Sequence, residues 1–142
     1  MVAKPQILDR RITSQVLENS NFTLCLRGDT LGSDRWINAM VAGTALIAVA
    51  DSSAELDWLP FPKVVPWHDI VLVIPRREFR KNPARALRKV IQETSSHRLQ
   101  QLQELSRHYA ADLDWSAPHS RMLKNMLREA IDIPCNVARN GI

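Results

Sequence analysis

The segment of this sequence best suited to ligand chemistry is Arg27-Gly-Asp-Thr-Leu-Gly-Ser-Asp-Arg35, where two glycines precede a helical pattern. The first backbone N–H groups of a helix are unpaired, and the helix dipole attracts anions to that end. Gly28 and Gly32 would let the backbone approach a ligand closely, and Ser33 could cap the helix or bind a phosphate oxygen. The segment therefore predicts an anion site.

Arg35 adds a second argument for an anion. A cation in the first helical turn opposes the helix dipole at a cost of ~0.3–1 kcal/mol. A bound diphosphate would offset that cost through a bidentate guanidinium contact. A surface pair of Asp34 and Arg35 beside an ordinary turn would account for the same residues, so the loop alone leaves both interpretations open.

The strands and the helix expected on either side of this loop predict its position in the fold. Residues 22–26 and 45–49 are apolar runs, and the second has no alternation, as in a strand buried on both faces of a parallel sheet. A helix is expected between them, from Ser33 or Asp34 to about residue 42. This order is a βαβ unit with a right-handed crossover. We expect Gly43 to end the helix, and its buried face to consist of Trp36, Ile37, Met40 and Val41.

The rest of the chain predicts a second buried strand, 70–74, after an irregular loop at 57–68 that is rich in proline and tryptophan. Residues 11–19 are weakly helical. We predict an α/β fold in one domain, 1–142, with a short, mostly parallel sheet, flanking helices and a motif core at 22–51. C-terminal helices are expected within 83–133, at about 83–93, 96–110 and 119–131.

The composition favours anionic binding partners but does not identify which anion is bound. The chain has 142 residues, 45% hydrophobic and 24% charged, and a net charge of +4, which favours anionic partners. No uncharged run reaches the ~20 residues of a membrane span, and charged residues near the start argue against a signal peptide. Cys25 and Cys135 form neither a disulfide framework nor a metal-ligand spacing, so no metal site is expected.

A basic segment, 76–89, carries seven cations in fourteen residues: Arg76, Arg77, Arg80, Lys81, Arg85, Arg88 and Lys89. It could bind phosphates, nucleic acid or an acidic glycan, or it could be a solvated helix face. Phe79 is its one aromatic residue, which argues against binding to single-stranded nucleic acid.

Two pairs of loop side chains have two interpretations each. His68 and Asp69 could be an acid–base pair or a surface pair, and Trp58 and Trp67 could stack on a ligand or pack onto the sheet.

The run from Phe22 to Asp51 resembles the central motif of the exostosin-like glycosyltransferases. Leu59-Pro-Phe61, Val64-Val-Pro-Trp67 and the strand to Ile74 also resemble the family's next segment, so the similarity extends over about residues 18–110. The motif positions that agree, with identical spacing, are Phe22, Leu24, Gly28, Asp29, Thr30, Ser33, Arg35, Ala39, Gly43, Ile47 and Asp51.

The resemblance implies the donor-binding lobe of a two-lobed, GT-B type enzyme with Rossmann-like lobes. Such enzymes transfer sugar with inversion from a nucleotide sugar, usually a UDP-sugar, to a polysaccharide or glycoprotein glycan, without a metal or another cofactor. Ser33 and Arg35 would contact the diphosphate, and position 38 would bind the ribose. If this domain is part of a longer, membrane-anchored chain, the resemblance implies that the protein is located in the Golgi. The implied donor-binding residues are Arg27, Gly28, Asp29, Thr30, Ser33, Arg35, Asn38 and Asp51.

This sequence departs from the family pattern in two places. Asn38 stands where the family has an acidic residue, and an amide is the weaker partner for a diol. The family's proline is absent from Thr44–Ile47. We expect a fragment or partner-dependent half that lacks the acceptor lobe, with an exposed sheet edge that favours association. Whether it is an enzyme by itself stays open, as do its catalytic residues. The alternative is a decayed, non-catalytic α/β module that binds an anionic polymer or a protein through residues 76–89.

Overall fold

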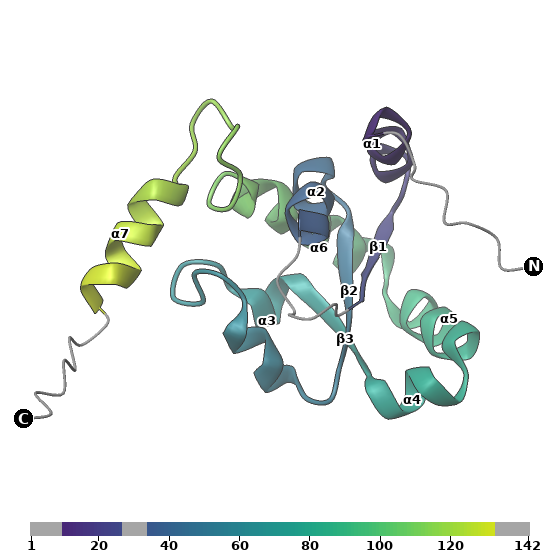
Figure 1. Cartoon of the computed structure of the whole chain (residues 1–142). Coiled ribbons are helices and arrows are strands. Elements are labelled where there is room, and N and C mark those ends of the chain that lie inside the picture. The colour runs from purple at the N-terminus through teal and green to yellow at the C-terminus, as the bar shows by residue number, and fades with distance from the viewer. Residues whose placement is uncertain (1–9, 27–33, 133–142) are drawn as a thin grey trace, which may run out of the picture.

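The computed structural model describes residues 10–26 and 34–132, which form a parallel sheet with helices on both faces (Figure 1). The strands are β1 (Phe22–Cys25), β2 (Ala45–Ala50) and β3 (Val71–Pro75), in the order β1-β2-β3. Both pairings are parallel, with Leu24 opposite Ile47 and Ala48 opposite Val73. The structure therefore confirms the predicted α/β class and the short parallel sheet.

All six residues of β2 are buried, because helices cover both faces of this central strand. Leu46 and Ala48 belong to one apolar cluster, and Ile47 and Val49 belong to the other. Side chains alternate between the faces of a strand, so burial on both faces requires an unbroken apolar run. The outer edges of β1 and β3 have no neighbouring strand within the described residues.

The first face is covered by α2 (Asp34–Ala42) and α6 (Ser96–Ala110), with α3 (Trp67–Ile70) and the 3₁₀ helix η1 (Ser53–Trp58) beside them. The second face is covered by α4 (Arg76–Lys81) and α5 (Pro83–Glu93). Helix α1 (Arg10–Glu18) contacts α2. The sheet therefore lies between two helical layers.

Helix α2 ends where the sequence predicts, at a Schellman motif. Gly43 has a φ of +70° and donates to the Met40 carbonyl oxygen at 2.9 Å, while Thr44 donates to that of Ala39 at 3.1 Å. Glycine adopts this left-handed conformation without a Cβ penalty. The predicted apolar face was wrong in one member: Val41 is 54% exposed, and Ala39 is fully buried instead.

Helix α7 (Met122–Asp132) is attached to the domain through a buried polar cluster. Asp112 is 2% exposed and accepts from Arg121 Nε at 2.8 Å, from Arg121 Nη2 at 2.6 Å and from Asn125 Nδ2 at 2.9 Å. Hydrogen bonds from Arg121 hold the pKa of Asp112 below its ordinary value, against the effect of burial. Exposed apolar side chains remain along α7: Leu123, Met126, Leu127 and Ile131.

Other differences from the sequence prediction are local. Helices α5 and α6 have the expected bounds, but α7 begins at Met122 because turns occupy 115–119. The loop expected at 57–68 overlaps the end of η1 and the start of α3, and the basic run 76–81 is a helix, α4.

Of the two loop tryptophans, Trp67 packs into the core as one interpretation predicts, and ligand stacking by Trp58 stays a prediction. Trp67 is 2% exposed and donates from Nε1 to the Pro60 carbonyl oxygen at 2.9 Å, whereas Trp58 is 85% exposed. His68 contacts the Asp57 carboxylate at 2.7 Å as an exposed pair, so its partner is Asp57 instead of Asp69. No helix of the described chain is long and apolar enough to cross a membrane.

Candidate functional site

The carboxyl ends of the three strands meet at one edge of the sheet, which is where open α/β sheets place ligand groups. β1 ends at Cys25, Asp51 follows β2 and Arg76 follows β3. Because β1 and β2 are parallel, the helix between them begins at this same edge, which brings Arg35 there. The predicted residues Arg35 and Asp51 thus lie along one edge.

The other predicted donor-binding residues are only partly covered by the structure. Arg27, Gly28, Asp29, Thr30 and Ser33 lie outside the described residues. Their assignment stays a prediction.

Asn38 is exposed on α2, one turn after Arg35. It borders a groove of about 630 Å³ between α1, α2 and the turn at 113–116. Asp51 lines a different pocket. Since residues three apart on a helix share a side, Asn38 and Arg35 lie on the same side of α2, whereas Asn38 and Asp51 line different pockets.

Cys25, at the end of β1, is buried and is not a nucleophile. Burial raises the pKa of its thiol to about 12, and the positive charge of Arg35 acts in the opposite direction. The thiolate is the reactive form of cysteine, so this thiol stays protonated and inert at neutral pH. The effect of Arg35 on Cys25 also indicates that the guanidinium lies near the end of β1.

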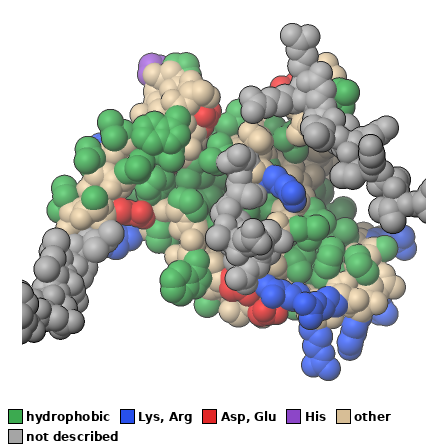
Figure 2. Space-filling view, in the orientation of Figure 1, with side chains coloured by type: hydrophobic (Ala, Val, Ile, Leu, Met, Phe, Trp, Pro, Cys, Tyr) green, Lys and Arg blue, Asp and Glu red, His purple; other side chains and the backbone are tan. Residues whose placement is uncertain are grey.

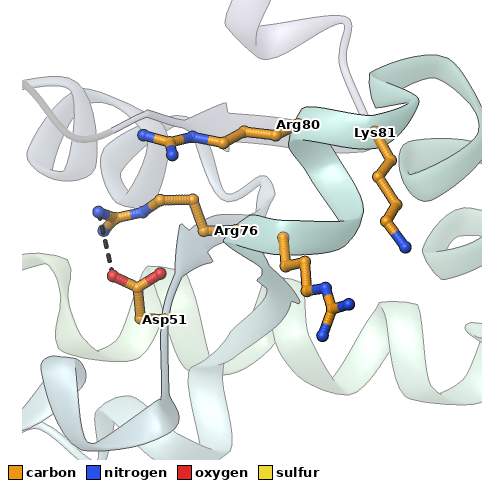
Figure 3. Close-up of a pocket in the computed structure, with 5 residues that line it drawn as sticks. Asp51, Arg76, Arg80 and Lys81 are labelled. Carbon is orange, nitrogen blue, oxygen red and sulfur yellow. Dashed lines mark ion pairs between the residues drawn. The ribbon is translucent and has the colours of Figure 1, made fainter.

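Asp51 forms an ion pair with Arg76 that connects the ends of β2 and β3 (Figure 3). Together with Glu55, these two residues form a polar cluster that we call the brace. Its Oδ2 lies 3.1 Å from Arg76 Nη1, and Arg76 Nη2 lies 3.5 Å from Glu55 Oε2. The other oxygen of Glu55 accepts from the Asp51 backbone N–H at 2.6 Å. Arg76 is thereby oriented by two carboxylates, while the Asp51 side chain remains 66% exposed to solvent.

A pocket of about 340 Å³ opens beside this brace. Lys and Arg side chains gather there at the lower right of the molecule, over α4 and α5 (Figure 2). The basic segment 76–89 is divided between these two helices, and only its α4 part lines the pocket. The lining residues are Asp51, Arg76, Arg77, Arg80 and Lys81.

Sequence reasoning treated residues 76–89 as one charged stretch and missed Arg76 as the partner of Asp51. The position of Arg76 is a signal that could have found it, since it directly follows a buried strand, as Asp51 does. Residues in such positions on neighbouring parallel strands meet at the same sheet edge. Within the described residues no group of three His, Cys, Asp or Glu side chains could hold a metal ion.

No family model matches the chain. The chain is similar to an Exostosin-1 homolog from Caenorhabditis elegans, with 30% identity over 101 residues. This match supports an exostosin-like relationship. It covers 70% of this chain but only 24% of the relative, so the chain spans about a quarter of that protein's length.

Proposed function

We propose that this chain is the nucleotide-sugar-binding part of an inverting glycosyltransferase, with a UDP-sugar as donor and a glycan of a polysaccharide or glycoprotein as acceptor. One observation carries the proposal: the exostosin similarity extends over 101 residues of a chain that folds as a parallel sheet with helices on both faces. The relationship also favours a Golgi enzyme. Because the chain spans a quarter of its relative, the whole activity would require further protein.

The donor would lie along the sheet edge at which the carboxyl ends of the strands meet, which we call the carboxyl edge. Its diphosphate would lie at the first turn of α2. Arg35 is exposed there, and its side chain forms no ion pair or hydrogen bond within the described residues. A free guanidinium at a helix start is costly unless an anion is bound, and its fork matches phosphate oxygens. The Asn38 amide, one turn later, would hydrogen-bond the ribose hydroxyls.

The part of the reaction assigned to this chain is leaving-group stabilisation. In an inverting transfer the acceptor hydroxyl attacks the anomeric carbon, the bond from that carbon to the phosphate oxygen breaks, and the nucleoside diphosphate leaves with its electron pair. Negative charge grows on the diphosphate during this step, and a positioned cation such as Arg35 lowers the barrier. The base that accepts the hydroxyl proton would come from the acceptor-binding part.

Ligand-observed NMR with UDP tests the proposal on the wild-type chain and the Arg35→Ala variant. We expect saturable binding that weakens about tenfold in the variant, which corresponds to ~1.4 kcal/mol for one exposed charge-assisted contact. Arg128→Ala is the matched control, because Arg128 is exposed on α7. A folded wild-type chain that does not bind UDP, or equal losses in both variants, would rule out this donor site.

A further inference from the structure

The pocket beside α4 has a composition and a geometry that the donor proposal does not use. We propose that it binds a phosphate group of a small ligand, with Arg76 and Arg80 as the principal contacts and Arg77 and Lys81 at its rim. This inference goes beyond UDP binding at Arg35 and has a separate test. Its basis is the placement of four cations around one pocket at the ends of β2 and β3.

The rotation of α4 about its axis is fixed by Phe79, which packs against the apolar cluster on the second face of the sheet. Arg76 and Arg80 are one turn apart and therefore lie on the same side of the helix. Figure 3 shows both guanidinium groups extending to the same side, toward Asp51, while Lys81 extends away from them. Two guanidinium groups are thus presented together at the carboxyl edge.

Arg76 is already oriented for binding. Its side chain is 25% exposed and is held by the carboxylates of Asp51 and Glu55 at 3.1 and 3.5 Å. A guanidinium has five N–H donors in a rigid fork, so these two contacts leave donors for a ligand. Because the side chain is fixed before binding, less conformational entropy is lost when an anion arrives.

The other three cations are uncompensated. Within the described residues, Arg77, Arg80 and Lys81 form no ion pair or side-chain hydrogen bond. Cations outnumber carboxylates four to one in the pocket lining. Like charges one turn apart, as in Arg77 and Lys81, repel each other and destabilise the helix. An anion in the pocket would remove that repulsion.

The shape of the pocket favours a compact phosphate over a long polymer. Its volume of about 340 Å³ suits a small anionic group, and guanidinium groups bind phosphate through paired N–H···O bonds. A polymer would need cations in a continuous track along the backbone. Yet Arg85, Arg88 and Lys89 on α5, which would extend such a track, do not line the pocket.

Inorganic pyrophosphate is the probe for the test. Amide chemical shifts are followed during its titration into the wild-type chain at constant ionic strength, with Arg80→Gln and Arg77→Gln alongside. Arg88→Gln is the matched control, since it removes the same charge from α5, outside the pocket. Thermal unfolding of each variant shows that it is folded, which is expected because all three side chains are exposed.

We expect saturable shifts at α4 and Asp51, an affinity at least about tenfold weaker in Arg80→Gln and a smaller loss in Arg77→Gln. Arg88→Gln should change the affinity by less than about twofold. Absence of saturable binding, or equal losses in Arg80→Gln and Arg88→Gln, would overturn the proposal. Binding confined to a long polyanion such as DNA would overturn it as well, and would assign residues 76–89 to a polymer.

A parallel titration with UDP separates two sources of the phosphate. If Arg80→Gln weakens UDP and pyrophosphate alike, the pocket binds the diphosphate of the donor. If it weakens pyrophosphate alone, the pocket binds a separate phosphate ligand. Both outcomes support a phosphate in the pocket. Failure of the donor proposal is seen independently, as UDP binding that is absent or insensitive to Arg35→Ala.

Discussion

Replacing Asp112 with alanine should loosen α7 from the rest of the domain. It should lower the free energy of unfolding of the domain by about 3 kcal/mol. The variant leaves two partners behind. Arg121 is 43% exposed and can be rehydrated, so losing its ion pair costs only ~1 kcal/mol. Asn125 is 2% exposed, and among the described residues its side chain would keep only the 3.5 Å hydrogen bond from Nδ2 to the backbone carbonyl of residue 112. Losing the bond to the carboxylate at this buried position therefore costs ~1–3 kcal/mol. These two contributions account for the expected loss.

Urea unfolding followed by tryptophan fluorescence measures this loss, and hydrogen exchange of the α7 amides locates it. Asp57→Ala is the control, since its pair with His68 is exposed and should contribute less than ~0.5 kcal/mol. A loss below ~1 kcal/mol in Asp112→Ala, or α7 amides as protected as in the wild-type chain, would refute the reasoning.

The pH dependence gives an independent check on the same group. The pKa of Asp112 is lower in the folded chain than its ordinary value of 3.8, because Arg121 donates to its ionised form. A lowered carboxyl pKa contributes stability that is complete above the unfolded-state pKa and is lost as the pH falls toward the folded-state pKa. The loss of stability below about pH 4 should therefore be shallower in Asp112→Ala than in the wild-type chain.

Gly43→Ala should destabilise the chain by ~1 kcal/mol in urea unfolding, because alanine is strained at a φ of +70° and its Cβ would meet the Arg107 side chain; an unchanged midpoint would contradict this. The Cys25 thiol should react with a disulfide reagent only on unfolding, and fast labelling of the native chain would show that it is accessible. Since its pKa is raised to about 12 from 9.0, the stability that it contributes should be lost as the pH rises above 9, and a Cys25→Ala variant should lack that loss.

The elements predicted correctly from the sequence are those whose signals are local. Helices α5 and α6 have clear beginnings, because the Asn82 side chain accepts from the Arg85 N–H and the Ser95 side chain from the Arg98 N–H. The six buried residues of β2 form one apolar run, and Gly43 ends α2. A solvated helix face was one interpretation of residues 76–89, but α4 was not given bounds of its own, because its sequence, Arg-Arg-Glu-Phe-Arg-Lys, offers a single apolar residue and no amphipathic stripe.

Contacts between residues far apart in the chain could not be predicted in this way. Asp112 and Asn125 are 13 residues apart, and their hydrogen bond depends on a turn that positions α7. The positions of Asp51 and Arg76, each directly after a strand, place both at the same sheet edge, but their ion pair also requires the two strands to be neighbours, which one sequence does not specify. Arg35 and Asp51 could be placed at one edge because a βαβ unit requires it, whereas Val41 was assigned to the wrong side of its helix.

The sheet order β1-β2-β3 has a kinetic consequence. Ligands of open α/β sheets sit in a crevice where the strand order reverses, and the described sheet runs in one direction without such a reversal. A ligand held on this edge by the described residues alone would be contacted from one side and remain largely hydrated. Its residence time should then be short, because the described residues provide no opposite wall to slow dissociation. Bound and free ligand should then exchange rapidly in solution, and an added wall would lengthen the residence time without changing any contact on this edge.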